Sequence, residues 1–168
     1  MRQVSRPAAS GVPDSKPTGP PPLRPFGLVL HHDGCFTHEG ERILNRKLRE
    51  HFDRSVEYLS EEGKYIVRLG HFRGEVEIEE AGFFVRSVEL QTGEITLSDR
   101  TREPLDVSSL EESPIDGALL CRVKKKLAAG GLIARFMHGP HAELLQSVES
   151  EGDGFVLLIA GERRQFPV

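Results

Sequence analysis

The amino-acid sequence contains no tryptophan, only two cysteines and no long apolar run. Its longest apolar stretch, residues 155–160, is long enough for one strand, whereas a membrane-spanning helix needs about 20 residues. The start of the chain also lacks the apolar segment of about 7–15 residues that a secretory signal requires. Cys35 and Cys121 lie far apart and outside any Cys-x-x-Cys motif, so we expect two free thiols in a cytoplasmic protein with no membrane segment.

A surplus of positive charge is also missing. The chain has 22 Lys and Arg against 26 Asp and Glu, which gives a net charge of −4. Binding to duplex nucleic acid depends on many cationic side chains that neutralise phosphates, so nucleic acid is an unfavoured partner. The glycine pair at 130–131 lacks the Lys-Ser/Thr of a phosphate-binding loop and the third glycine of a dinucleotide-binding turn. No cofactor is therefore predicted.

Proline is concentrated at one end of the chain, where seven of the 11 prolines lie within residues 1–25. Such a segment cannot bury enough apolar area to offset the entropy lost on ordering, which predicts a disordered tail over residues 1–25. Three consecutive prolines at 20–22 favour the extended polyproline II conformation. The rest of the chain is long enough to bury a hydrophobic core.

The remaining sequence predicts two small, similarly built lobes of the α+β class. Apolar and polar side chains alternate in short segments between turn dipeptides, as expected for antiparallel strands. The predicted hairpins include one over residues 26–37, with its turn at Asp33-Gly34, and one at the C-terminus over residues 155–168, with its turn at Gly161-Glu162. One short helix is predicted in each half, over residues 45–53 with an asparagine cap and over residues 140–149 with proline in its first turn. Each helix needs an apolar sheet face to cover. We therefore expect lobes over residues 26–79 and 80–168, each a mainly antiparallel sheet covered by one helix.

Three stretches of the chain have a distinctive order of residues. Residues 34–52 contain glycine, an aromatic residue, a second glycine and isoleucine before a short helix that ends in phenylalanine. Residues 65–85 contain a strand, two acids, alanine and then Phe-Val, and residues 132–145 contain an Ala-Arg-aromatic strand followed by a helix. This order resembles a bacterial domain-of-unknown-function family, the one numbered twelve eighty-five. The sequence departs from that family at Leu69-Gly70, where the family tends to have Thr-Pro, and at Gly82, where it has proline.

The resemblance spans nearly all of residues 26–168 and rests on order and spacing, because none of its motifs is catalytic. It implies a two-lobed α+β fold with a repeated motif, no established activity, and a role in signalling by binding. It supplies no catalytic residues for this chain.

Residues 118–141 are basic within an acidic protein, with five Lys or Arg and no acid. If residues 119–127 form one strand, Arg122, Lys124 and Lys126 share a face. Together with Arg135 they are the predicted ligand-binding residues, and the partner would be an anionic small molecule or an acidic protein. Two other interpretations remain open: lysines that protect a solvated edge strand, or lysines paired with the acidic residues of 98–117.

His31, Cys35 and His38 are the densest group of reactive side chains. A histidine could approach Cys35 across the predicted hairpin, which raises the alternative of a small metal-dependent enzyme. However, His31 and His32 would point to opposite faces of a strand, and no second ligand pair has zinc-finger spacing. The sequence therefore favours a non-catalytic ligand-binding or adaptor module, with no catalytic residue assigned and no metal site predicted.

Overall fold

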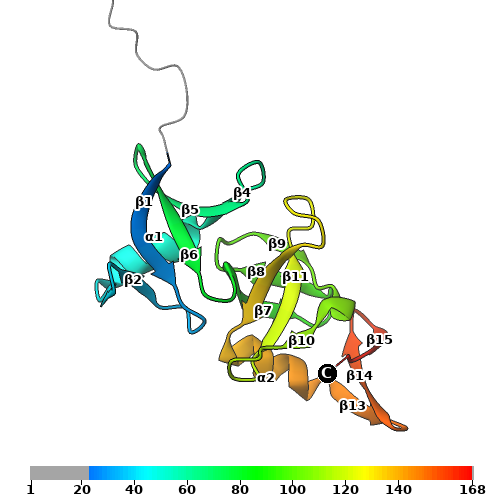
Figure 1. Cartoon of the computed structure of the whole chain (residues 1–168). Helices are drawn as coiled ribbons and strands as arrows, with labels where there is room; N and C mark the ends of the chain where they lie inside the picture. The colour runs from blue at the N-terminus through cyan, green and yellow to red at the C-terminus, as the bar shows by residue number, and fades with distance from the viewer. Residues whose placement is uncertain (1–22, 168) are drawn as a thin grey trace, which may run out of the picture.

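The computed structural model describes residues 23–167, and Figure 1 shows two lobes that lie side by side. Most of the predicted tail, including its three consecutive prolines, lies outside the described residues. Arg24 and Pro25, the last residues assigned to that tail, instead belong to the first strand, because they pair with Gly74 and Glu75. Within the described range, no helix is long and apolar enough to cross a membrane.

The first lobe is built on a six-stranded sheet. Its strands are β1 (Arg24–Leu30), β2 (Phe36–His38), β3 (Glu41–Arg42), β4 (Glu57–Leu59), β5 (Lys64–Leu69) and β6 (Phe72–Ile78). They lie in the order β3-β2-β1-β6-β5-β4. Neighbouring strands are antiparallel except at the centre, where β1 and β6 run parallel. Two three-stranded meanders thus meet along one parallel pair.

Helix α1 (Arg46–Ser55) connects the two meanders of this sheet. The Asn45 side chain accepts a hydrogen bond from the Leu48 amide at 3.1 Å, which confirms the predicted cap. Phe52 is buried against Phe36 of β2, with ring centroids 5.6 Å apart. Burying a side chain of this size stabilises the fold by about 1.5–3 kcal/mol. The helix therefore covers the sheet through the apolar face that the sequence indicated.

The second lobe repeats the strand order of the first. Its strands are β7 (Phe83–Glu89), β8 (Glu94–Leu97), β9 (Arg102–Pro104), β10 (Glu111–Glu112), β11 (Leu119–Val123) and β12 (Leu132–Phe136). They lie in the order β10-β11-β12-β7-β8-β9, and again only the central pair, β12 and β7, is parallel. A single 3-10 turn, η1 (Val107–Ser109), replaces the helix between the two meanders.

The helix of the second lobe follows its sheet instead of interrupting it. Helix α2 (His138–Gln146) contacts β7 and ends before Ser147, three residues earlier than predicted. The reason is that Val148 pairs with Leu157 and starts a third, three-stranded sheet. Its strands are β13 (Val148–Glu151), β14 (Gly154–Ile159) and β15 (Glu162–Gln165), and the last two form the predicted C-terminal hairpin.

The fold is therefore α+β with two similarly built lobes, as the sequence predicted, and each lobe has one helix. The repeat itself differs from the prediction. The order of the six strands recurs in both sheets. The helix of the first lobe lies in the connection between its two meanders, whereas the helix of the second lobe follows the last strand of its sheet.

The two lobes share a continuous hydrophobic core. At their junction the ring of Tyr65 (β5) packs against Phe83 (β7), with centroids 6.1 Å apart. A Cβ atom added to Gly82 would lie 2.2 Å from Cε1 of Tyr65, so only glycine fits beneath this ring. Burial raises the pKa of Tyr65 to about 12. The tyrosine ring therefore occupies the space that a side chain at position 82 would need.

Candidate binding site

The strand that carries the predicted basic stripe ends earlier than expected. β11 stops at Val123, and a hydrogen bond from the Leu127 amide to the Lys124 carbonyl, 2.9 Å long, closes a turn. Lys124 has a positive φ of 51°, which a continuing strand does not allow. Lys124 and Lys126 therefore do not extend the strand face of Arg122. Three consecutive lysines supply no alternating apolar side chain for the sheet to bury, which is why the strand gives way to a turn.

This turn nevertheless gathers the basic side chains around one cavity of about 630 Å³, which we call the basic groove. It lies between the lysine turn and the end of β9 with the residues that follow it. Its lining residues are Glu103, Pro104, Leu105, Asp106, Arg122, Lys124, Lys125, Lys126 and Leu127. Four cations and two carboxylates thus surround an apolar surface formed by proline and leucine side chains.

Acidic residues of the preceding segment pair with most of these cations. Arg122 forms an ion pair with Glu111 at 3.1 Å, and Lys125 pairs with Asp106 at 2.5 Å. The hydrogen bond from Lys125 lowers the pKa of Asp106. Lys126 has no ion-pair or hydrogen-bond partner among the described residues.

Lys124 differs from its neighbours because it is mostly buried. Its ammonium group lies 2.7 Å from Asp99, and the two side chains are only 12% and 14% exposed. The same Nζ lies 4.8 Å from the centroid of the Phe83 ring, a cation–π distance. Lys124 therefore anchors the turn to the sheet, and the exposed cations of the groove are the ones available to a partner.

Arg135, the fourth predicted site residue, is not brought together with the lysine turn. It lies on β12, is buried at the junction of the lobes, and forms ion pairs with Glu80 at 2.6 Å and Asp116 at 2.5 Å. Burial by itself would lower the pKa of Arg135, but its hydrogen bonds to Asp116 and Glu80 outweigh that effect and raise it. Arg135 lines a different cavity, of about 280 Å³, with His32 and His138 among its neighbours.

The three residues of the metal hypothesis are also separated. His31 and Cys35 share a small cavity, where the Arg42 guanidinium donates a hydrogen bond to the Cys35 sulfur. His38 instead stacks on Phe26, with centroids 4.8 Å apart. Within residues 23–167, no group of three or more His, Cys, Asp or Glu side chains is arranged to hold a metal ion.

Both cysteines are free thiols. Cys35 is half-buried beside Arg42, and Cys121 is fully buried in the second sheet. Burial raises the pKa of the Cys121 thiol to about 12, so this side chain remains protonated and acts as a small apolar residue.

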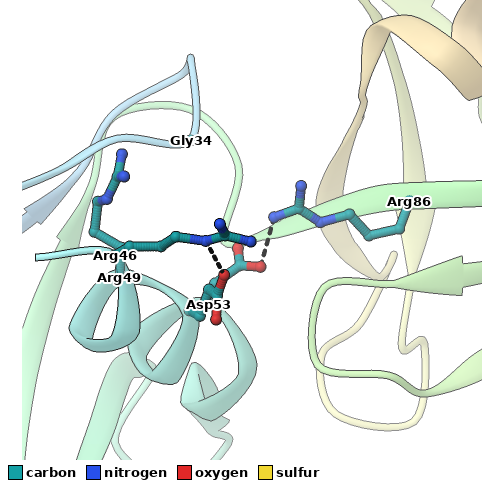
Figure 2. Close-up of a pocket in the computed structure, with 6 residues that line it drawn as sticks. Gly34, Arg46, Arg49, Asp53 and Arg86 are labelled. Carbon is teal, nitrogen blue, oxygen red and sulfur yellow. Dashed lines mark hydrogen bonds and ion pairs between the residues drawn. The ribbon is translucent and has the colours of Figure 1, made fainter.

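Sequence reasoning missed a second cationic cluster, at the junction between α1 and β7. Figure 2 shows Arg46 and Arg49 on α1 and Arg86 reaching from β7 toward Asp53. One signal was present in the sequence: the first turn of α1 carries arginines and no acid, although helix N-termini favour acidic side chains. Nothing in the sequence indicated that Arg86 would join them, because it comes from the other lobe.

By its fold, the chain is a two-lobed α+β protein in which two six-stranded sheets have the same strand order. No protein-family model and no curated protein matches the chain. Among solved structures, it is similar to a DUF1285 family protein from Silicibacter pomeroyi DSS-3, with 17% sequence identity and a TM-score of 0.58. That match covers 90% of this chain and 89% of the other.

A second DUF1285 family protein, from Shewanella baltica OS155, matches with 12% identity and a TM-score of 0.47 over 71% of this chain and 91% of the other. The Silicibacter match shows that the chain has the fold of a DUF1285 family protein. The family resemblance noted in the sequence is thereby confirmed at the level of the fold.

Proposed function

We propose that the protein is a non-catalytic binding module that holds an acidic segment of a partner protein in the basic groove. The observation that carries this proposal is the joining of three accessible cations, Arg122, Lys125 and Lys126, to an apolar surface in one cavity of about 630 Å³. Cations attract the carboxylates of the partner, and burying the apolar surface against an apolar side chain of the partner stabilises the complex.

The ion pairs around the groove leave its cations available. The side chains of the Arg122–Glu111 pair are 38% and 49% exposed, and those of the Lys125–Asp106 pair are 56% and 28% exposed. Pairs that water reaches in this way contribute only about 0–1 kcal/mol. A carboxylate from a partner can therefore replace the internal one at little cost. Lys126 needs no such exchange, because it has no partner among the described residues.

An acidic polypeptide fits this groove better than a small anion does. The groove is lined by cations and also by Leu127, whose side chain is 39% exposed. A peptide with spaced carboxylates and an apolar side chain would use both features, whereas a small anion would use the cations alone. These features support an acidic protein as the proposed partner, and with it an adaptor or signalling role.

We also propose that the lobes divide at about residue 80 and that the protein acts in the cytoplasm. The division is supported by the short connection between the last strand of the first sheet, β6, and the first strand of the second, β7.

A labelled peptide of alternating glutamates with one central leucine tests the groove by fluorescence anisotropy. We expect Lys126→Glu to weaken binding about 3- to 10-fold, because it places a like charge opposite the peptide. Lys47→Glu is the matched control, since Lys47 is an exposed lysine of α1 that does not line the groove. Binding should also weaken as salt is raised.

Amide shifts of residues 122–127 in a heteronuclear NMR titration locate the peptide. Shifts confined to other surfaces, or equal losses in the two variants, would overturn the proposal. If free glutamate shifts the same amides as strongly as the peptide does, the site takes a small anion and the acidic partner is excluded.

A further inference from the structure

The junction between the lobes contains a cavity of about 240 Å³ that is separate from the basic groove. Helix α1 supplies Arg46, Arg49, Glu50 and Asp53, the β1–β2 turn supplies Gly34, and β7 supplies Arg86. Figure 2 shows how the side chains from the two lobes meet there. A ligand in this cavity would contact both lobes at once.

Two of its three arginines are already paired. Arg46 donates to Glu50 at 2.7 Å, and Arg86 reaches across the junction to Asp53 at 2.5 Å. These are the dashed contacts in Figure 2. With both carboxylates neutralised in this way, the cavity keeps one cationic group in excess.

The excess cation is Arg49. Its Nε atom is buried and has no hydrogen-bond acceptor among residues 23–167. Its guanidinium forms no hydrogen bond or ion pair with a carboxylate in that range, and its charge acts on Glu50 only as one of several that lower the pKa of that carboxyl. A buried donor without an acceptor destabilises the fold, and more so on a charged group, so the side chain at this position gains from an external acceptor.

We propose that this cavity binds a small oxyanion, a carboxylate or a phosphate group, through Arg49, with Arg46 and Arg86 beside it. A guanidinium presents its donors as a planar fork that matches two oxygens of such a group. A neutral ligand would leave the charge of Arg49 uncompensated, and a cation would be repelled. Because α1 and β7 belong to different lobes, the bound anion ties the lobes together.

This inference is independent of the basic groove and is tested by isothermal titration of the full chain with inorganic phosphate and with acetate. Ionic strength is held constant with sodium chloride. We expect Arg49→Gln to weaken binding of the preferred anion about 10- to 100-fold. Arg49→Lys should weaken binding less, because lysine keeps the positive charge but lacks the planar fork of donors. The anion that binds more tightly identifies the ligand group as phosphate or carboxylate.

Lys47→Gln is the matched control, because it removes one charge from the same helix at a position that does not line the cavity. Lys126→Glu should also leave phosphate and acetate binding unchanged, which separates this site from the groove. Equal affinity in the wild type and Arg49→Gln, or no binding of either anion to the wild type at tens of millimolar, would overturn the proposal.

An NMR titration of the wild-type protein guards against a variant that fails to fold. Phosphate or acetate should shift the amides of Gly34, Arg49 and Arg86. Shifts confined to the lysine turn at 124–127 would show that the anion binds elsewhere and would contradict the assignment.

Discussion

Two neighbouring strands carry ion pairs of the same chemistry in opposite environments. On β12, Arg135 and its partner Glu80 are 9% and 7% exposed at the lobe junction. On β11, Arg122 lines the basic groove and pairs with Glu111 of β10, and the two side chains are 38% and 49% exposed. The sequence around both arginines looks alike, yet the fold buries one in a structural contact and leaves the other partly exposed.

Burial explains the difference. Removing Arg135 and Glu80 from water carries a desolvation penalty, which the structure offsets by surrounding them with further partners. Asp116 accepts from the same guanidinium, and the Ser113 hydroxyl donates to Glu80. The Arg122 pair avoids that penalty but gains little, because water screens its charges.

The largest predicted effect comes from removing the buried arginine. Arg135→Met should destabilise the protein by about 3–5 kcal/mol, because Glu80 is left buried with an uncompensated charge. Arg122→Met is the matched control on the adjacent strand, and it should cost less than about 1 kcal/mol. Urea unfolding followed by circular dichroism measures both values.

Similar losses for the two variants would show that burial does not separate the pairs. Adding Glu80→Gln to Arg135→Met should recover part of the loss, since it removes the stranded charge. If this second change brings no recovery, the penalty arises from packing instead.

How far the sequence could predict these features depends on the range of the contacts. Local signals were sufficient for the Asn45 cap, for the C-terminal hairpin and for the α+β class. Long-range pairing was not visible: alternation predicts strands but cannot show that β1 returns beside β6 in a parallel pair.

The candidate site was predictable only in part, for the same reason. A run of basic residues is evident in the sequence, but whether each one is buried depends on distant elements. Lys124 meets Asp99 and the Phe83 ring, and Arg135 meets Glu80, through contacts that only the folded sheets create. Arg49 and Arg86 lie in different lobes and share a cavity only because the lobes pack together.

A steric change at the same junction should have an intermediate effect. Gly82→Ala places a Cβ atom 2.2 Å from Tyr65 Cε1, so the ring or the backbone must move. We expect a loss of about 1–3 kcal/mol, measured by urea unfolding. Gly139→Ala is the control, because no atom lies within 4 Å of its added Cβ and alanine favours the helix.

Combining Gly82→Ala with Tyr65→Val tests whether the ring is the cause. The double variant should lose less than the sum of the two single losses, since the clash disappears with the ring. Additive losses would mean that the junction is disturbed in some other way.

The smallest predicted effect concerns an exposed ion pair. It tests whether burial, or position at the lobe junction, decides how much an ion pair contributes to stability. His32 lies in the same junction cavity as Arg135, but it is partly exposed and bonds to Glu79, with Nδ1 and Oε2 2.8 Å apart. This hydrogen bond raises the pKa of His32 above its ordinary 6.5, and the His32 backbone and side-chain hydrogen bonds lower the pKa of Glu79 below its ordinary 4.5.

The signs of these two shifts define a pH window for the pair. A raised histidine pKa contributes stability that is fully present below pH 6.5 and is lost as pH rises through the folded value. A lowered carboxyl pKa contributes stability that is present above pH 4.5 and is lost as pH falls through its folded value. Glu79→Gln should lower the pKa of His32 in an NMR titration, and it should reduce the decrease in stability that occurs above pH 6.5. Glu77→Gln, a change at a nearby exposed position, should have neither effect. If Glu79→Gln instead destabilised the protein as much as Arg135→Met, position at the junction, and not burial, would decide what an ion pair contributes.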